Sequence, residues 1–220
     1  MFAAPDRHLN LWKQQLGCVP ESVWDRIDLE TLVLADNGLT EVSERIGTLK
    51  QLRMLDLGHN QLARVPDAIG DLDGLTDFLY LHDNRLTTLP ASIGRLARLR
   101  YLNVGDNPMP ALPPAVCEMA GLIELRAPGN RLTALPACIG RLARLRELHL
   151  RDNRLTMLPD SIAALHELRQ IDLRGNPLAV LPDGVATLPR LEKLDLRWVT
   201  TLRMPAWVEE LEARGCVVYR

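Results

Sequence analysis

One asparagine recurs along this chain at an almost constant interval. Steps of 23, 24, 23, 23, 23 and 23 residues separate its seven copies, which are Asn37, Asn60, Asn84, Asn107, Asn130, Asn153 and Asn176. Around each copy the apolar residues follow one frame, LxxLxLxxNxLxxLPxxIGxLxx, which covers nearly the whole sequence. A fixed period in the twenties predicts a stack of structural repeats, because one unit of this size cannot bury its own apolar face.

Some stretches of the frame are almost identical. LPASIG (89–94) and LPACIG (135–140) differ at one position, and GRLARLR occurs unchanged at 94–100 and 140–146. This pattern resembles the leucine-rich repeat family, specifically the 23-residue class of plant intracellular Ras-group-related proteins, Scribble-type scaffolds and some bacterial effectors. The resemblance implies an α/β solenoid, a right-handed curved superhelix with a parallel β-sheet on its concave face. It also implies short helices or 3₁₀ turns on the convex face, and a protein that binds other proteins.

The residues of one unit suggest how it folds. The alternating Leu-x-Leu predicts a short strand, and successive strands would stack in parallel about 4.8 Å apart. The asparagine lies where the chain turns, and its amide can pair with backbone groups of adjacent coils that would each cost about 1–3 kcal/mol if buried unpaired. Proline suits the first position of a short helix, so the LP step predicts the start of a return path of one to three turns.

Length and composition favour one domain. With 220 residues and 47% apolar residues, the chain can bury one continuous core, and the repeats leave no room for a second. We therefore expect a single repeat domain over 1–220, with about nine repeats, an N-terminal capping repeat at 1–28 and a C-terminal capping repeat at 199–220. At 217–219, VVY falls in register for one more strand, with Val218 expected on the exposed row and an edge that would be unpaired.

The ends depart from the frame where caps are expected. Gln14 and Val199 take the place of the asparagine there. A terminal coil has a neighbour on one side only, so the loss of the bridging amide is typical of a capping repeat.

Composition also narrows the function and the compartment. A formal net charge of −2 gives no general attraction to nucleic acid, and no apolar stretch is long enough to span a membrane. The first twelve residues lack the layout of a signal peptide. The four cysteines form no close pairs in sequence and read as reduced, mostly buried thiols; they are Cys18, Cys117, Cys138 and Cys216. We expect a cytoplasmic protein, with secretion as an effector left open.

Variable positions beside the strand leucines should form the exposed concave face. Large apolar side chains gather there in Met54, Phe78, Tyr80 and Tyr101, although the chain has only two Phe and three Tyr. Such clusters mark contact sites, and tyrosine is typical of binding hot spots. The segment LDGLTDFLYLHDN carries the extra residue of the 24-residue step, so the alternative is that Phe78 turns into the core. We favour a contact site anchored on these four residues.

Farther along, the predicted face becomes polar and ionic. Its candidate binding residues are Asn103, Glu124, Arg126, Glu147, His149 and Arg151, followed by Asp172, Arg174, Asp195 and Arg197. One interpretation is a solvated surface of salt bridges, each worth less than about 1 kcal/mol. The other is a charged rim that orients the partner. Trp198, at the concave edge of the last repeat, either extends this surface or shields the end.

Catalytic and metal chemistry find little support in the pattern. Cys117 and Cys138 lie on convex returns, away from the histidines of the strands, so neither has a base to activate it. His59, His82, Asp83 and Asp106 could meet on adjacent coils, but a metal needs three or four convergent ligands. We therefore predict no catalytic, metal or cofactor site.

The function predicted is a non-enzymatic protein–protein interaction module that binds a protein on its concave face. Two alternatives stay open: a bacterial effector that recognises a host protein, and a structural unit that self-assembles through the C-terminal strand edge. The chain would be a monomer or a weak homodimer. Ras-linked members of the resembled class suggest a small GTPase as partner, but the shared residues are framework residues and do not identify one.

Overall fold

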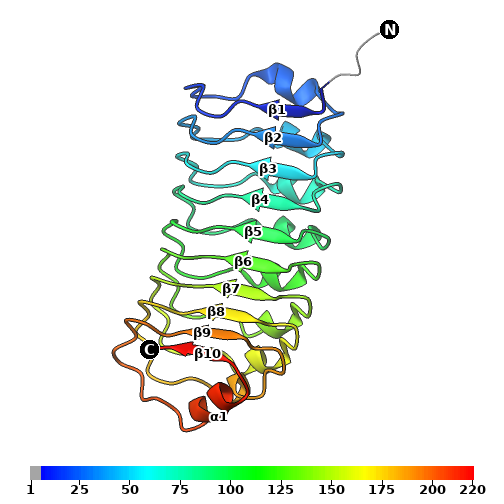
Figure 1. Cartoon of the computed structure of the whole chain (residues 1–220). Helices are drawn as coiled ribbons and strands as arrows, with labels where there is room; N and C mark the ends of the chain where they lie inside the picture. Colours follow the sequence, from blue (N-terminus) through cyan, green and yellow to red (C-terminus); the bar gives the residue numbers. More distant parts are fainter. Residues whose placement is uncertain (1–5) are drawn as a thin grey trace.

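Ten strands of three residues each form a single parallel sheet in the computed structural model, which describes residues 6–220. In Figure 1 the strands stack in chain order from β1 to β10. They are β1 (His8–Asn10), β2 (Thr31–Val33), β3 (Met54–Asp56), β4 (Phe78–Tyr80), β5 (Tyr101–Asn103), β6 (Glu124–Arg126), β7 (Glu147–His149), β8 (Gln170–Asp172), β9 (Lys193–Asp195) and β10 (Val217–Tyr219). The predicted solenoid is confirmed; residues 1–5 of the expected N-terminal cap lie outside the described residues.

The return path of each coil is short, and most returns contain 3₁₀ helix. These segments are η1 (Glu21–Asp25), η2 (Glu44–Thr48), η3 (Asp67–Asp71), η4 (Ala91–Arg95), η5 (Pro114–Glu118), η6 (Ile139–Arg141), η7 (Asp160–Ala164) and η8 (Asp183–Val185). Near the C-terminus the helix α1 (Val208–Ala213) takes their place. The LP proline precedes the 3₁₀ segment rather than opening it: Pro90 is extended, and its carbonyl accepts the N–H of Ile93 at 3.0 Å.

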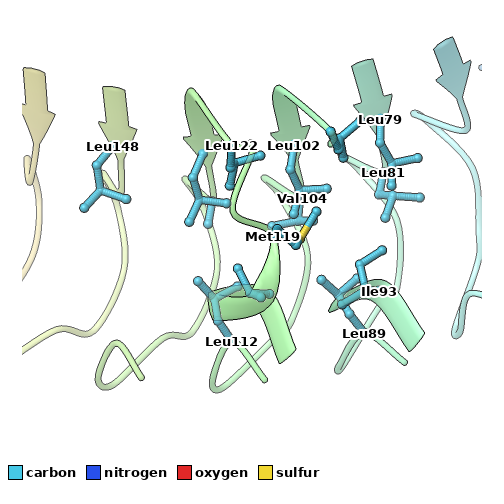
Figure 2. Packing of buried hydrophobic residues seen from close by; sticks show 14 of the residues in the cluster. Leu79, Leu81, Leu89, Ile93, Leu102, Val104, Leu112, Met119, Leu122 and Leu148 are labelled. Atoms are coloured by element: carbon cyan, nitrogen blue, oxygen red, sulfur yellow. The ribbon is translucent and has the colours of Figure 1, made fainter. Parts of the chain in front are cut away.

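One continuous core runs between the sheet and the returns. The middle residue of each strand from β2 to β9 is buried, as are Leu89 and Ile93 on the return path. Figure 2 shows strand side chains such as Leu79 and Leu102 facing the side chains of the return. Because every coil packs on its neighbours, the core is built along the whole stack and has no separate centre.

The last strand corrects one expectation from the sequence. Counting of the frame placed Val218 on the exposed row, but Val218 pairs in register with the buried Leu194 and packs against the core. Tyr219 pairs with Asp195 and is the residue on the exposed row. The reason is geometric: only the middle residue of each three-residue strand points inward, so its two neighbours face outward.

The chain turns sharply just before each asparagine and before Gln14 and Val199, which take its place at the two ends. The residue before this position has a left-handed conformation, with φ between 50° and 67°, in nine coils: Lys13, Asp36, His59, Asp83, Asp106, Gly129, Asp152, Gly175 and Trp198. Asp, Asn and Gly adopt this conformation more readily than bulky residues. Trp198 is therefore an outlier at a position where most coils carry Asp or Gly.

The structure contradicts the interpretation of two cysteines as reduced thiols. Cys117 and Cys138 form a disulfide, with Cα atoms 5.8 Å apart, while Cys18 and Cys216 are not bonded. Their separation of 21 residues, close to one repeat, places η5 and the segment before η6 in adjacent coils. The cysteine argument for a reducing compartment therefore no longer holds. Among residues 6–220, no helix is both long and apolar enough to cross a membrane.

Candidate functional site

Three aromatic rings from β4 and β5 meet on the exposed face of the sheet. The ring of Phe78 stacks on Tyr80, with centroids 5.9 Å apart and planes 12° from parallel, and it lies 5.5 Å from Tyr101. The rings of Tyr80 and Tyr101 are 5.1 Å apart. Met54 on β3 is in register with Phe78 and is half-buried. The four predicted anchors thus lie on the adjacent strands β3 to β5, and we call the three rings of Phe78, Tyr80 and Tyr101 the aromatic cluster.

The extra residue of the 24-residue step does not turn Phe78 into the core. In other coils a single residue before the strand donates to the preceding coil and accepts from the next, as Arg53 does. Here Asp77 donates to the carbonyl of Arg53 at 3.0 Å, whereas the carbonyl of Thr76 accepts the N–H of Arg100 at 3.0 Å. Thr76 and Asp77 therefore form a bulge that takes up the extra residue, and Phe78 keeps its register with Met54. Phe78 is 42% exposed, which settles the open alternative in favour of solvent.

Both tyrosines of the cluster remain neutral in the physiological range. Burial raises the pKa of Tyr101 to about 12, and burial also raises the pKa of Tyr80, with a further contribution from Asp56. A neutral phenol can donate and accept hydrogen bonds while its ring supplies apolar contact area. Each ring is therefore suited to a protein contact that is apolar at the centre and polar at the edge.

Beside the cluster the surface is hollowed by a cavity of about 430 Å³. Phe78 and Tyr101 form one side of it, and the ion pair between Arg53 and Asp77, 3.0 Å apart, forms another. The lining combines the apolar surfaces of Phe78, Tyr101 and Ile123 with four charged side chains, which are those of Arg53, Asp77, Arg100 and Glu124.

The next two strands carry the predicted ionic row. Nη1 of Arg126 lies 2.9 Å from Oε1 of Glu124, and Nε2 of His149 lies 3.1 Å from Oε2 of Glu147 and 3.7 Å from Oε1 of Glu124. Glu124 and Glu147 are paired in register, so their like charges would repel without a cation between them. Asn103 and Arg151 lie on the same face, where Oδ1 of Asn103 accepts the N–H of Gly105 at 3.0 Å.

Within the part of the chain that the structure describes, one group of side chains has the geometry for a metal. The ligand atoms of Glu124, Glu147 and His149 all lie within 4.8 Å of one another. One imidazole and two carboxylates could hold a zinc ion with an open fourth position. The guanidinium of Arg126 already neutralises Glu124, so the same residues are satisfied as an ion-pair network. We assign no metal to them.

His59 and His82, which the sequence suggested as possible metal ligands, lie in the turns that follow strands β3 and β4. Nε2 of His59 and Nε2 of His82 are 3.2 Å apart, and Nδ1 of His59 is 2.7 Å from Oδ2 of Asp83. His82 packs over Gly58, where a side chain would collide with the imidazole. Burial and the neighbouring His59 lower the pKa of His82.

At the C-terminal end a buried carboxylate holds two arginines. Oδ2 of Asp195 lies 2.7 Å from Nη2 of Arg197 and 3.5 Å from Nε of Arg174. Burial opposes ionisation of Asp195, but the hydrogen bonds and charges of Arg197 and Arg174 outweigh it and lower the pKa of this carboxyl. The guanidinium of Arg197 also lies over the rings of Tyr219 and Trp198, at 5.1 and 5.8 Å.

Trp198 extends the surface rather than shielding the end, since it is 68% exposed. Tyr219 was missed in the sequence analysis because the last strand was counted one residue out of register. The sequence pattern could have identified it, because VVY (217–219) aligns with KLD (193–195) of β9. This alignment assigns Val218 to the core and Tyr219 to the surface.

These features define a repeat protein whose sheet face offers an aromatic cluster and an ionic row. The family description "Leucine rich repeat" matches residues 27–78, 120–178 and 143–198, more than half of the chain. The chain belongs to the leucine-rich repeat family. None of the curated proteins gave a significant sequence match.

Several solved structures share the fold. The leucine-rich repeat domain of the type III effector XopL aligns with a TM-score of 0.84 and 25% identity, over 98% of this chain and 77% of that one. A leucine-rich repeat protein of Leptospira interrogans aligns with a TM-score of 0.73 and 28% identity, over 96% and 65%. The ectodomain of the receptor kinase GASSHO1/SCHENGEN3 from Arabidopsis thaliana, in complex with CASPARIAN STRIP INTEGRITY FACTOR 2, gives 0.78 and 26%, over 91% and 25%. The chain spans less than two thirds of the last two proteins.

Proposed function

We propose that this protein is a non-enzymatic binding module that holds a protein partner on the concave face of its sheet. The observation that carries the proposal is the mutual contact of Phe78, Tyr80 and Tyr101 on an exposed surface. Rings held by neighbouring strands lose little conformational freedom on binding, so they can contribute more to affinity than equally exposed mobile side chains.

The partner contact extends, in this proposal, from Met54 through the aromatic cluster to the ionic row. The aromatic cluster supplies apolar area, and the row from Glu124 to Arg151 sets the orientation of the partner and the association rate. Complexes among the structural neighbours support a protein as the kind of ligand, because the Arabidopsis ectodomain was solved in complex with CASPARIAN STRIP INTEGRITY FACTOR 2. They do not indicate which protein binds this chain.

A second candidate function is that of an effector that recognises a host protein. It is favoured by the similarity to the repeat domain of XopL, which extends over 98% of this chain. The two functions use the same surface and differ in the origin of the partner. A secretion assay with tagged protein separates them, since only an effector is exported to a host.

The test is a pull-down that compares wild type with a Tyr80→Ala/Tyr101→Ala variant. A matched control is Met157→Ala/Val180→Ala, because Met157 and Val180 are 54% and 53% exposed but lie outside the aromatic cluster. We expect the partner to be retained by wild type and by the control and lost from the tyrosine variant, with circular dichroism unchanged in all three.

Two results would count against the proposal. Equal capture by all three proteins would move the contact away from the aromatic cluster. Absence of any partner, together with a size in solution that increases with protein concentration, would favour self-assembly through β10, where Val217 and Tyr219 are 50% and 41% exposed.

A further inference from the structure

A second cavity, of about 220 Å³, lies on the same face, three strands from the aromatic cluster. Four cationic side chains line it from β6 to β9 and the turns after them, accompanied by one carboxylate and one imidazole. They are Arg126, Arg151, Arg174 and Lys193, with Asp172 and His149. We call this cavity the basic pocket.

Two of the four cations already have strong internal partners. Nη1 of Arg126 is 2.9 Å from Glu124, and Nη2 of Arg174 is 2.6 Å from Oδ2 of Asp172. These ion pairs fix the two guanidinium groups in place, which reduces the entropy that a ligand would otherwise have to remove.

The other two cations are poorly neutralised. Nε of Arg151 is 3.9 Å from Asp152, its neighbour in sequence, and Arg151 is exposed. For Lys193, no carboxylate of residues 6–220 lies within 4.0 Å of the ammonium, which instead lies 5.4 Å from the ring of Tyr219. The lining of the pocket thus carries four cations and one carboxylate, although the chain as a whole has a net charge of −2.

We propose that the basic pocket receives an acidic side chain of the same protein segment whose apolar residue contacts the aromatic cluster. The inference rests on the proposed function and adds the chemistry of the partner. Complementary charge supports this choice of occupant, because a carboxylate would pair with Arg151 and Lys193 without displacing the internal ion pairs.

The spacing of the strands sets the spacing of the partner's residues. About three strand intervals separate the aromatic cluster, on β4 and β5, from the centre of the basic pocket, which is about 14 Å at 4.8 Å per interval. An extended chain advances about 3.3 Å per residue. The acidic residue of the partner is therefore expected about four or five positions from its apolar anchor, in a segment that crosses the strands.

The test uses a phage-displayed library of random dodecapeptides selected on the full chain. We expect wild type to enrich peptides with Asp or Glu four or five positions from an aromatic or aliphatic residue. A synthetic peptide of that consensus should bind Arg151→Glu/Lys193→Glu at least tenfold more weakly. The control is Arg131→Glu/Arg154→Glu, which makes the same charge change at exposed residues directly after Asn130 and Asn153, outside the basic pocket. This variant should bind the peptide as wild type does.

The outcomes separate this inference from the proposed function. Enriched peptides with an apolar anchor but no acidic preference would overturn the basic pocket and leave the aromatic cluster standing. Equal weakening by both charge-reversal variants would also overturn it, since only general electrostatics would then be acting. Failure to enrich any peptide would contradict both proposals.

Discussion

The backbone N–H of Asn37 donates to Oδ1 of Asn60, 23 residues further along the chain, over 3.1 Å. The same oxygen accepts the N–H of Leu39 at 3.0 Å, and Nδ2 of Asn60 donates to the carbonyl of Leu34 at 3.1 Å. Each asparagine thus pairs with backbone groups of the preceding coil. The ladder stops where Val199 replaces the asparagine, since valine has no side-chain amide.

Substitution of Asn60 by alanine should destabilise the protein by about 2–6 kcal/mol. The change leaves the N–H groups of Asn37 and Leu39 buried without an acceptor, and each unpaired group costs about 1–3 kcal/mol. Urea denaturation followed by circular dichroism measures the loss. Gln61→Ala, at the next position and exposed, serves as the control and should be nearly neutral. Equal stability of the two variants would mean that water replaces the ladder.

Strain at Trp198 predicts an unusual order of stability among its substitutions. Its φ of 61° is unfavourable for any residue with a Cβ, by about 1–2 kcal/mol, and glycine is free of that penalty. Trp198→Gly should therefore be about 1 kcal/mol more stable than Trp198→Ala, although glycine usually destabilises folded chains. Thermal unfolding of both variants checks the order. If the Trp198→Ala variant is at least as stable as the Trp198→Gly variant, the turn relaxes when the indole is removed.

The disulfide between Cys117 and Cys138 should contribute about 3 kcal/mol, because it closes a loop of about 20 residues in the unfolded chain. Cys117→Ser/Cys138→Ser should lower the free energy of unfolding by that amount and abolish the effect of reductant. Cys18→Ser, at an exposed unpaired cysteine, is the control.

The redox state of the disulfide in cells also tests the compartment. Alkylation of native cell extract followed by mass spectrometry reports the state of Cys117 and Cys138. Free thiols would favour the cytoplasmic location predicted from the sequence, and an intact bond would favour an oxidising compartment.

Mild acid should destabilise the protein through His82. Burial, then the neighbouring His59, hold the pKa of His82 below its ordinary value of 6.5, against the opposing attraction of nearby aspartates. As the pH falls through 6.5, the unfolded chain takes up a proton that the folded chain resists, so the free energy of unfolding decreases. Between pH 7 and pH 5.5 the urea midpoint of wild type should fall further than that of His82→Asn. Parallel decreases would assign the effect to other groups.

The sequence by itself determined the solenoid, the strand positions, the buried leucines and the asparagine ladder. These features follow from a local pattern repeated many times, so an error in one unit is corrected by the others. Leu79 and Leu102, for example, occupy the same place in their units and are both buried. The exposed row that contains Tyr80 and Tyr101 followed from the same period, since neighbours of an inward leucine on a strand face outward.

Only the tertiary structure decided which residues of different units meet. Cys117 and Cys138 occupy different repeat positions and still bond, because adjacent coils bring non-equivalent positions of their returns within reach. Phe78 faces solvent because the bulge at Thr76 and Asp77 absorbs the extra residue before the strand begins. The basic pocket depends on side chains from four coils and on which carboxylates already pair with them. A period fixes the place of each residue within its coil, whereas distances between coils depend on packing that no single repeat encodes.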